Sequence, residues 1–389
     1  MSSGTPPEGL ASCVRRSRRT GNGRRAPYHP GRVRVRRSAV PILLALAGGL
    51  AGRLYLAAAF EGNFDQQSWE IISAIMRRGG NVYAETDRLN YSPLFAYVLL
   101  VLDHVRSLTG LPAHLVIRGT LAIADVFVAI LLALIARQVA PGRARATFIL
   151  YFLNPVAILL VGYHGQLEIL AALPLLLATW LHGRPRAPHA AVTWALGSLS
   201  LLVKHLLAFQ VWMLFTYSFS RFGRLAASGL AGAVLVLSFI PFRDAGDEIL
   251  RDVVSRAGFG GIYGFGSLLP RAISLPLFAG VMAALPSIAR ERLALGLPQA
   301  MSFSALMLLT MIDGIANQYF LVPIIFGSLA PRVGYWVYTA AATAFLLAST
   351  DNVGVLPLAI PWNVVWVAAV VWAVEMVVRP APRRVLAPA

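Results

Sequence analysis

The sequence predicts an all-α protein whose helices cross the membrane many times. Of its 389 residues, 57% are hydrophobic and only 13% are charged, which is too few charges to cover a soluble protein of this size. Apolar runs recur from residue 39 to residue 378, and many are long enough to cross a bilayer core. Helices satisfy their own backbone polar groups there, so we expect a polytopic bundle of about 11 to 13 spans.

The first element is a basic leader, residues 1–38, which is rich in Gly, Pro and Ser and carries ten arginines. It accounts for much of the net charge of +17. Because basic residues beside a first span favour the cytoplasmic side, the leader is interpreted as a cytoplasmic anchor attracted to anionic lipid. A nucleic-acid-binding tail is the less favoured alternative, and no nucleic-acid partner is expected. The single cysteine, Cys13, excludes an intramolecular disulfide framework and a cysteine metal cluster.

The transmembrane domain is expected over residues 39–378, followed by a cytoplasmic tail over 379–389. Two segments are too polar to be spans: 61–92, the first extracytoplasmic loop, and 243–270, a second polar loop. The candidate spans are 39–60, 93–108, 114–137, 145–163, 166–183, 190–220 (one span or a tight pair), 225–242, 271–289, 300–313, 317–330, 334–350 and 357–378.

The arginines in the loops predict the orientation. If 93–108 crosses fully, two basic loops of the first half fall outside, against the positive-inside rule. If 93–108 is a re-entrant or peripheral helix and 190–220 is a tight pair, both loops lie inside. We prefer the second arrangement. It predicts that one external face carries Asp65, His164, Lys204, Asp313 and Asn317.

The first loop begins with "FDQQSWEIISAIMRR", in which Phe64, Trp69, Ile72 and Ile75 or Met76 form one helical stripe. This spacing predicts an amphipathic helix lying at the membrane surface. Asp65 stands at its N-terminal end, where two interpretations are open. The carboxylate is either a helix N-cap or a functional group.

Polar residues continue through the loop and into the spans. Tyr83, Tyr91 and Tyr97 suit either an interfacial belt or stacking on sugar faces. "YHGQLEIL" places His164, Gln166 and Glu168 against an apolar run, where they form either a functional site or a hydrogen-bonded helix start.

"LLVKHLLAF" holds Lys204, the only lysine in the sequence, beside His205. A buried cation needs an anionic partner. The partner is a lipid-linked phosphate or an acid such as Asp125, unless the lysine snorkels to an interface.

Arg118 lies two turns before Asp125 on the same face of a predicted span, where both are expected to be structural or to line a cavity. "GFGGIYGFGSLLPR" lacks the context of a nucleotide-binding motif and is expected to be a gating loop.

In order and spacing, these segments resemble the GT-C glycosyltransferases, multi-spanning enzymes that use polyprenyl-phosphate sugars. The chain is similar in particular to bacterial glycosyltransferase and mannosyltransferase families, and more loosely to the dolichyl-phosphate glucosyl- and mannosyltransferases. It rests on "FDQQSWEI", "VYAETDRLNYSPLFAY", "NPVAILLVGYHGQLEILAALPLLLA", "SLLVKHLLAFQVWML" and "NQYFLVPI". The chain departs from the family pattern in having "YSP" where Tyr-Pro-Pro is common and Glu168 where Asp or Asn is common. The acid that the family has in its first loop is represented here by Asp65 alone. Glu61, Glu85 and Asp87 are the alternative candidates for the base.

The resemblance implies an inverting transfer of a hexose, with mannose expected, from a polyprenyl-phosphate donor to a lipid- or glycan-linked acceptor. The reaction would take place at the extracytoplasmic face of the cell membrane, with no cofactor and no required metal. Asp65 would be the general base. The implied substrate-binding residues are Tyr91, Arg118, His164, Gln166, Lys204, His205 and Gln318.

Two other functions stay open. A transporter or flippase for a lipid-linked sugar would use the polar residues to line a path. A non-catalytic assembly subunit would not need Asp65.

Overall fold

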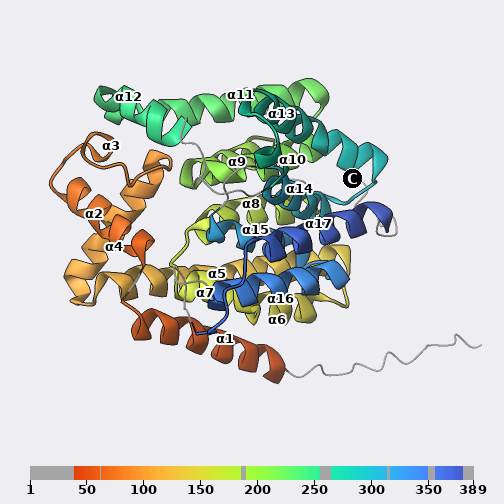
Figure 1. Cartoon of the computed structure of the whole chain (residues 1–389), viewed down its shortest axis with the longest axis horizontal. Coiled ribbons are helices and arrows are strands. Elements are labelled where there is room, and N and C mark those ends of the chain that lie inside the picture. Colours follow the sequence, from red (N-terminus) through yellow and green to blue (C-terminus); the bar gives the residue numbers. More distant parts are fainter. Residues whose placement is uncertain are drawn as a thin grey trace, which may run out of the picture. The chain divides into compact units, whose positions relative to one another are not determined.

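The computed structural model describes residues 39–61, 63–184, 190–254, 264–312, 316–348 and 355–379. All regular elements within these ranges are helical, which confirms the all-α part of the predicted fold class (Figure 1). The basic leader, residues 258–263 of the expected gating loop, Asp313 and most of the C-terminal tail lie outside the described residues.

The α-helices are α1 (Val40–Ala59), α2 (Phe64–Arg77), α3 (Val82–Glu85), α4 (Pro93–Thr109), α5 (Ala113–Val139), α6 (Ala144–Phe152), α7 (Pro155–Gly162), α8 (Glu168–His182), α9 (Ala190–Val203), α10 (Ala208–Ser218), α11 (Arg221–Leu237), α12 (Gly246–Ile249), α13 (Arg271–Ser287), α14 (Leu297–Met311), α15 (Leu321–Gly327), α16 (Val333–Ala348) and α17 (Asn363–Val378). Short 3-10 or π segments are η1 (His205–Leu207), η2 (Ile240–Ala245), η3 (Leu250–Val254), η4 (Phe265–Leu268), η5 (Ile288–Arg292) and η6 (Asn317–Phe320).

Three helices in the described residues are long and apolar enough to cross a bilayer: Val40–Ala59, Ala113–Val139 and Ala272–Arg292. Two pairs qualify if each is one bent span, namely Ala144–Phe152 with Pro155–Gly162 and Arg221–Leu237 with Ile240–Val253, which gives up to five. Shorter apolar helices accompany them. α4, which the charge distribution predicts to be peripheral or re-entrant, is not among the candidate spans.

Two breaks in the helices have local causes and position polar residues. Asn154 caps α7 by accepting a hydrogen bond from the Val156 N–H at 2.9 Å, and Pro155 suits the first helical position. The segment 190–220 also divides, because Lys204 adopts an extended conformation between α9 and η1. The only lysine therefore lies at a helix break.

The amphipathic helix predicted in the first loop is present as α2, but its apolar face is covered by protein. Trp69, Ile72 and Ile75 are buried, and the Trp69 ring packs edge-on against Phe95 of α4 with 4.8 Å between centroids. Only Phe64 of the predicted stripe is largely exposed. The expectation that this face lies on the membrane surface is therefore wrong, because α4 buries it. Together α2, α3 and α4 gather at one end of the long helices (left in Figure 1).

A fully buried ion pair joins three helices of the core. Arg53 of α1 pairs with Asp125 of α5, and the Tyr151 hydroxyl of α6 donates to the second Asp125 oxygen. The Arg53 guanidinium also donates to the Phe152 carbonyl at 2.8 Å. Asp125 is thus the partner of Arg53, and the alternative that pairs it with Lys204 is wrong.

We predict that Asp125→Ala destabilises the protein by about 3–5 kcal/mol, because Arg53 would remain buried without a counter-charge. Thermal unfolding of the detergent-solubilised protein measures the change. Asp244→Ala is the control, since Asp244 and its partner Arg243 are both largely exposed and contribute little. Equal melting temperatures for the two variants would contradict this role of Asp125.

Candidate functional site

The N-cap of α2 is Asn63. Its side-chain oxygen accepts the Gln66 N–H at 3.1 Å, while Asp65 is already the second residue of the helix. The interpretation of Asp65 as the cap is therefore wrong. Asn63 has a further contact, since its Nδ2 lies 2.7 Å from Nδ1 of His164. This contact ties the start of α2 to the segment that follows α7.

Asp65 is half-buried and bound by a residue 101 positions away. Gln166 Nε2 donates to Asp65 Oδ2 at 2.5 Å, and Gln166 itself is 1% exposed. Gly165, just before it, has a φ of +65°, and a Cβ there would lie 3.3 Å from Cγ of Arg118. Glycine suits both the left-handed conformation and this close approach. The turn between α7 and α8 thus brings Gln166 to Asp65 and its own backbone to Arg118.

Burial raises the pKa of the Asp65 carboxyl above its ordinary value. The hydrogen bond from Gln166 and the positive charge of Lys204 act in the opposite direction, and burial dominates. A half-buried carboxylate with a raised pKa holds a proton more strongly than an exposed one. Asp65 is therefore suited to accept a proton.

Lys204 forms a buried ion pair with Glu168. Its Nζ lies 2.5 Å from Glu168 Oε1, and both side chains are almost fully buried. The same Nζ is 4.5 Å from the ring centroid of Tyr91 and 5.8 Å from that of Tyr319. The second Glu168 oxygen, Oε2, is buried without a hydrogen-bond partner in the described part of the chain. Of the partners that the sequence left open for Lys204, an acid is present, but it is Glu168.

The loop before α4 contacts this ion pair and the backbone beside it. Gln318 donates to the Tyr91 hydroxyl at 3.4 Å, and the Tyr83 hydroxyl donates to the Tyr91 carbonyl at 2.7 Å. Ser92 Oγ donates to the carbonyl of Leu202 at 2.6 Å, two residues before Lys204. The first loop and the helix break after α9 are therefore held together. Tyr83 and Tyr91 are buried inside the protein, and only Tyr97 is exposed as an interfacial residue would be.

Arg118 has donor groups that no described residue accepts. One nitrogen donates to the Phe60 carbonyl at 2.7 Å. Its Nε and Nη2 are buried without an acceptor among the described residues, and the side-chain oxygens of Gln66 and Gln166 are likewise unsatisfied. Buried polar groups are normally hydrogen-bonded, so unused groups gathered in one place indicate a site for a polar ligand or water. Free guanidinium donors suit an anionic oxygen.

The structure brings most of the predicted site residues into this one cluster. They are Asp65, Tyr91, Arg118, His164, Gln166, Lys204 and Gln318. His205 follows Lys204 in η1 and interacts with it electrostatically, but no hydrogen bond joins its side chain to the others, and its Nδ1 is buried without a partner among the described residues. The reserve acids Glu61, Glu85 and Asp87 are exposed, and Glu85 pairs with Arg78.

Asn63 was not predicted as a site residue, and Glu168 was considered only as one of three residues of a possible functional cluster, without an assigned role. The sequence did contain a signal for Glu168, because an acid in an apolar segment needs a cation and the chain has one lysine. Asn63 could have been found as a cap three residues before Gln66. Among the described residues, no group of three or more His, Cys, Asp or Glu could hold a metal ion.

Comparison with known proteins adds no relative: no family model, no curated protein and no solved structure matches this chain.

Proposed function

We propose that this protein is an integral-membrane glycosyltransferase of the GT-C type, with about 11 to 13 spans. It transfers a hexose, with mannose expected, from a polyprenyl-phosphate donor to a lipid- or glycan-linked acceptor at the extracytoplasmic face. The observation that carries the proposal is the placement of a half-buried Asp65 beside Gln166, within electrostatic range of Lys204. A proton acceptor and cations for a leaving phosphate are thus close together.

In the proposed reaction, Asp65 takes the proton of an acceptor hydroxyl while the hydroxyl oxygen attacks the anomeric carbon. The bond between that carbon and the phosphate oxygen breaks on the opposite face of the sugar, which inverts the configuration. Polyprenyl phosphate leaves with the electron pair, and Asp65 later releases the proton to water.

The cations have different roles in this mechanism. Two nitrogen atoms of Arg118 lack an acceptor in the part of the chain that the structure describes, so Arg118 is the group best placed to bind the departing phosphate. Lys204 already shares its charge with Glu168, and its contribution is to hold Tyr91 and stabilise negative charge nearby. His164, which contacts Asn63, is placed to bind the donor or acceptor beside Asp65.

We predict that Asp65→Asn lowers transfer at least about 100-fold, because the amide cannot accept the proton. Membranes that contain either form are incubated with a panel of radiolabelled polyprenyl-phosphate sugars, and labelled acceptor is counted. Glu85→Gln is the matched control, since that acid pairs with Arg78 at the surface. Full transfer by Asp65→Asn at normal protein levels would favour the transporter or the assembly subunit instead.

We also predict an acid limb in the pH dependence of kcat/KM that lies above the ordinary carboxyl range, because burial raises the pKa of Asp65. Activity falls as the pH drops through this pKa, since the protonated base is inactive. Gln166→Leu removes a hydrogen bond that favours the carboxylate, so the limb moves to higher pH. An unchanged acid limb in Gln166→Leu would show that Asp65 is not the group whose protonation limits activity.

Lys204→Ala should weaken donor use and also destabilise the protein, because Glu168 loses its counter-charge. The double variant Lys204→Ala with Glu168→Ala removes both charges and should recover most of the lost melting temperature. We predict that this double variant still has a KM for donor raised about tenfold, equivalent to about 1.4 kcal/mol. A normal donor KM in the stable double variant would remove Lys204 from the donor site.

A further inference from the structure

A second polar site lies between α2 and α4, at the start of α5. It is a cavity of about 200 Å³. Its lining comprises Glu70, Ser73, Ala74, Arg77, Leu102, Asp103, Arg106, Ala113 and Ile117. The volume corresponds to several water molecules, and so to a group the size of one sugar ring. None of these residues belongs to the cluster around Asp65.

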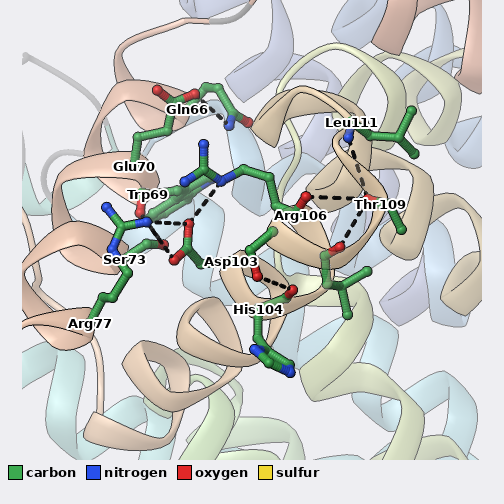
Figure 2. A network of polar contacts seen from close by, with 12 residues as sticks. Gln66, Trp69, Glu70, Ser73, Arg77, Asp103, His104, Arg106, Thr109 and Leu111 are labelled. Carbon is green, nitrogen blue, oxygen red and sulfur yellow. Dashed lines mark hydrogen bonds and ion pairs between the residues drawn. The ribbon is translucent and has the colours of Figure 1, made fainter.

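Asp103 orients two arginines at this cavity. Arg77 Nη1 donates to its two oxygens at 3.0 and 3.4 Å, and Arg106 Nε donates to Oδ1 at 2.9 Å (Figure 2). The Asp103 side chain is only 10% exposed, whereas the Arg77 and Arg106 side chains are 55% and 39% exposed and form the outer rim of the cavity. The other guanidinium nitrogens of Arg77 and Arg106 have no acceptor in the ranges that the structure describes. They remain available to a ligand.

The charges of the lining balance. Two arginines stand against two carboxylates, Glu70 and Asp103. A phosphate would meet repulsion from both acids, whereas a sugar hydroxyl can donate to a carboxylate and accept from a guanidinium at once. The remaining lining residues are small or apolar except for Ser73, which suits the apolar face of a sugar ring. This composition favours a neutral, hydroxyl-rich ligand over an anion.

A row of polar residues on α2 connects the cavity to the proposed catalytic site. Gln66, Glu70, Ser73 and Arg77 follow one another at helical spacings of three or four, so they share one face. Gln66 donates to Glu70 at 3.4 Å, and its own oxygen lies near Gly165 and Arg118. The row covers about 16 Å at 1.5 Å per residue. An acceptor of more than one unit fits this distance.

We propose that the cavity is an acceptor subsite that binds a neutral sugar unit and directs the acceptor along α2 toward Asp65. This inference rests on the proposed function for the direction of the acceptor, whereas sugar binding itself is independent of it.

Binding is tested with methyl α-D-mannopyranoside on the purified full-length protein, by saturation-transfer NMR. Arg77→Gln should weaken binding about tenfold, because one oriented donor is lost. Arg78→Gln is the matched control: Arg78 is the next residue, is equally exposed, and pairs with Glu85 away from the cavity. Equal binding by these two variants would overturn the proposal. Ala74→Leu, which fills the cavity without changing its charges, should also weaken binding, and retained binding would count against the proposal.

Two further arms identify the ligand and separate this inference from the proposed function. Inorganic phosphate should not compete with the glycoside, and competition that depends on Arg77 would show an anion site instead. Asp65→Asn should abolish transfer yet keep glycoside binding. If Asp65→Asn retains transfer while Arg77→Gln loses the glycoside, the proposed function fails and the sugar site stands. If Asp65→Asn loses transfer and Arg77→Gln binds normally, only the subsite fails.

Discussion

The buried ion pair between Lys204 and Glu168 is the contact on which the arrangement around Asp65 depends. It joins the first residue of α8 to the extended residue that ends α9, so both helices must meet at this point. Tyr91 packs on the same ammonium group, and Ser92 bonds the backbone just before it. Since an unpaired charge in an apolar interior is costly, the pair constrains the first loop as well as the two helices. Gln166, two residues before Glu168, is placed on Asp65 as a result.

Two buried ion pairs occur in the described part of the chain, and they differ in how completely their polar atoms are hydrogen-bonded. In the Arg53 network, Asp125 uses both oxygens and the guanidinium donates to two carbonyls, which is typical of a structural contact. Only Arg53 Nε in this network is buried without a partner among the described residues. Around Lys204, one Glu168 oxygen, two Arg118 nitrogens and two glutamine oxygens lack partners among the described residues. Burial alone therefore does not distinguish the candidate site from the structural network. The number of unsatisfied hydrogen-bonding groups differs, with these five atoms in the candidate site and one in the Arg53 network, and a bound ligand would satisfy them.

The two faces of α2 have separate tasks in the proposed mechanism. Its apolar face, centred on Trp69 and Ile72, is packed on α4 and holds the helix in place. Its polar row from Gln66 to Arg77 runs between the cluster and the charge-balanced cavity. Asn63 caps the helix and so leaves the Asp65 carboxylate to Gln166. In the proposed mechanism, one amphipathic helix thus positions the base and guides the acceptor. Its buried apolar face keeps the two sites at a fixed distance from each other.

The sequence by itself determined the helical fold class, the amphipathic helix of the first loop and most members of the polar cluster, because hydrophobic period and the rarity of charge are local properties. It did not determine which buried charges pair with each other. Asp125 belongs to Arg53 and Lys204 to Glu168, although the sequence placed Arg118 and Asp125 on one helix face. It also did not show that α4 covers the apolar stripe of α2, since a stripe faces lipid or protein with the same spacing. Only the tertiary structure decided these points, because which buried charges and apolar faces meet depends on how distant helices pack.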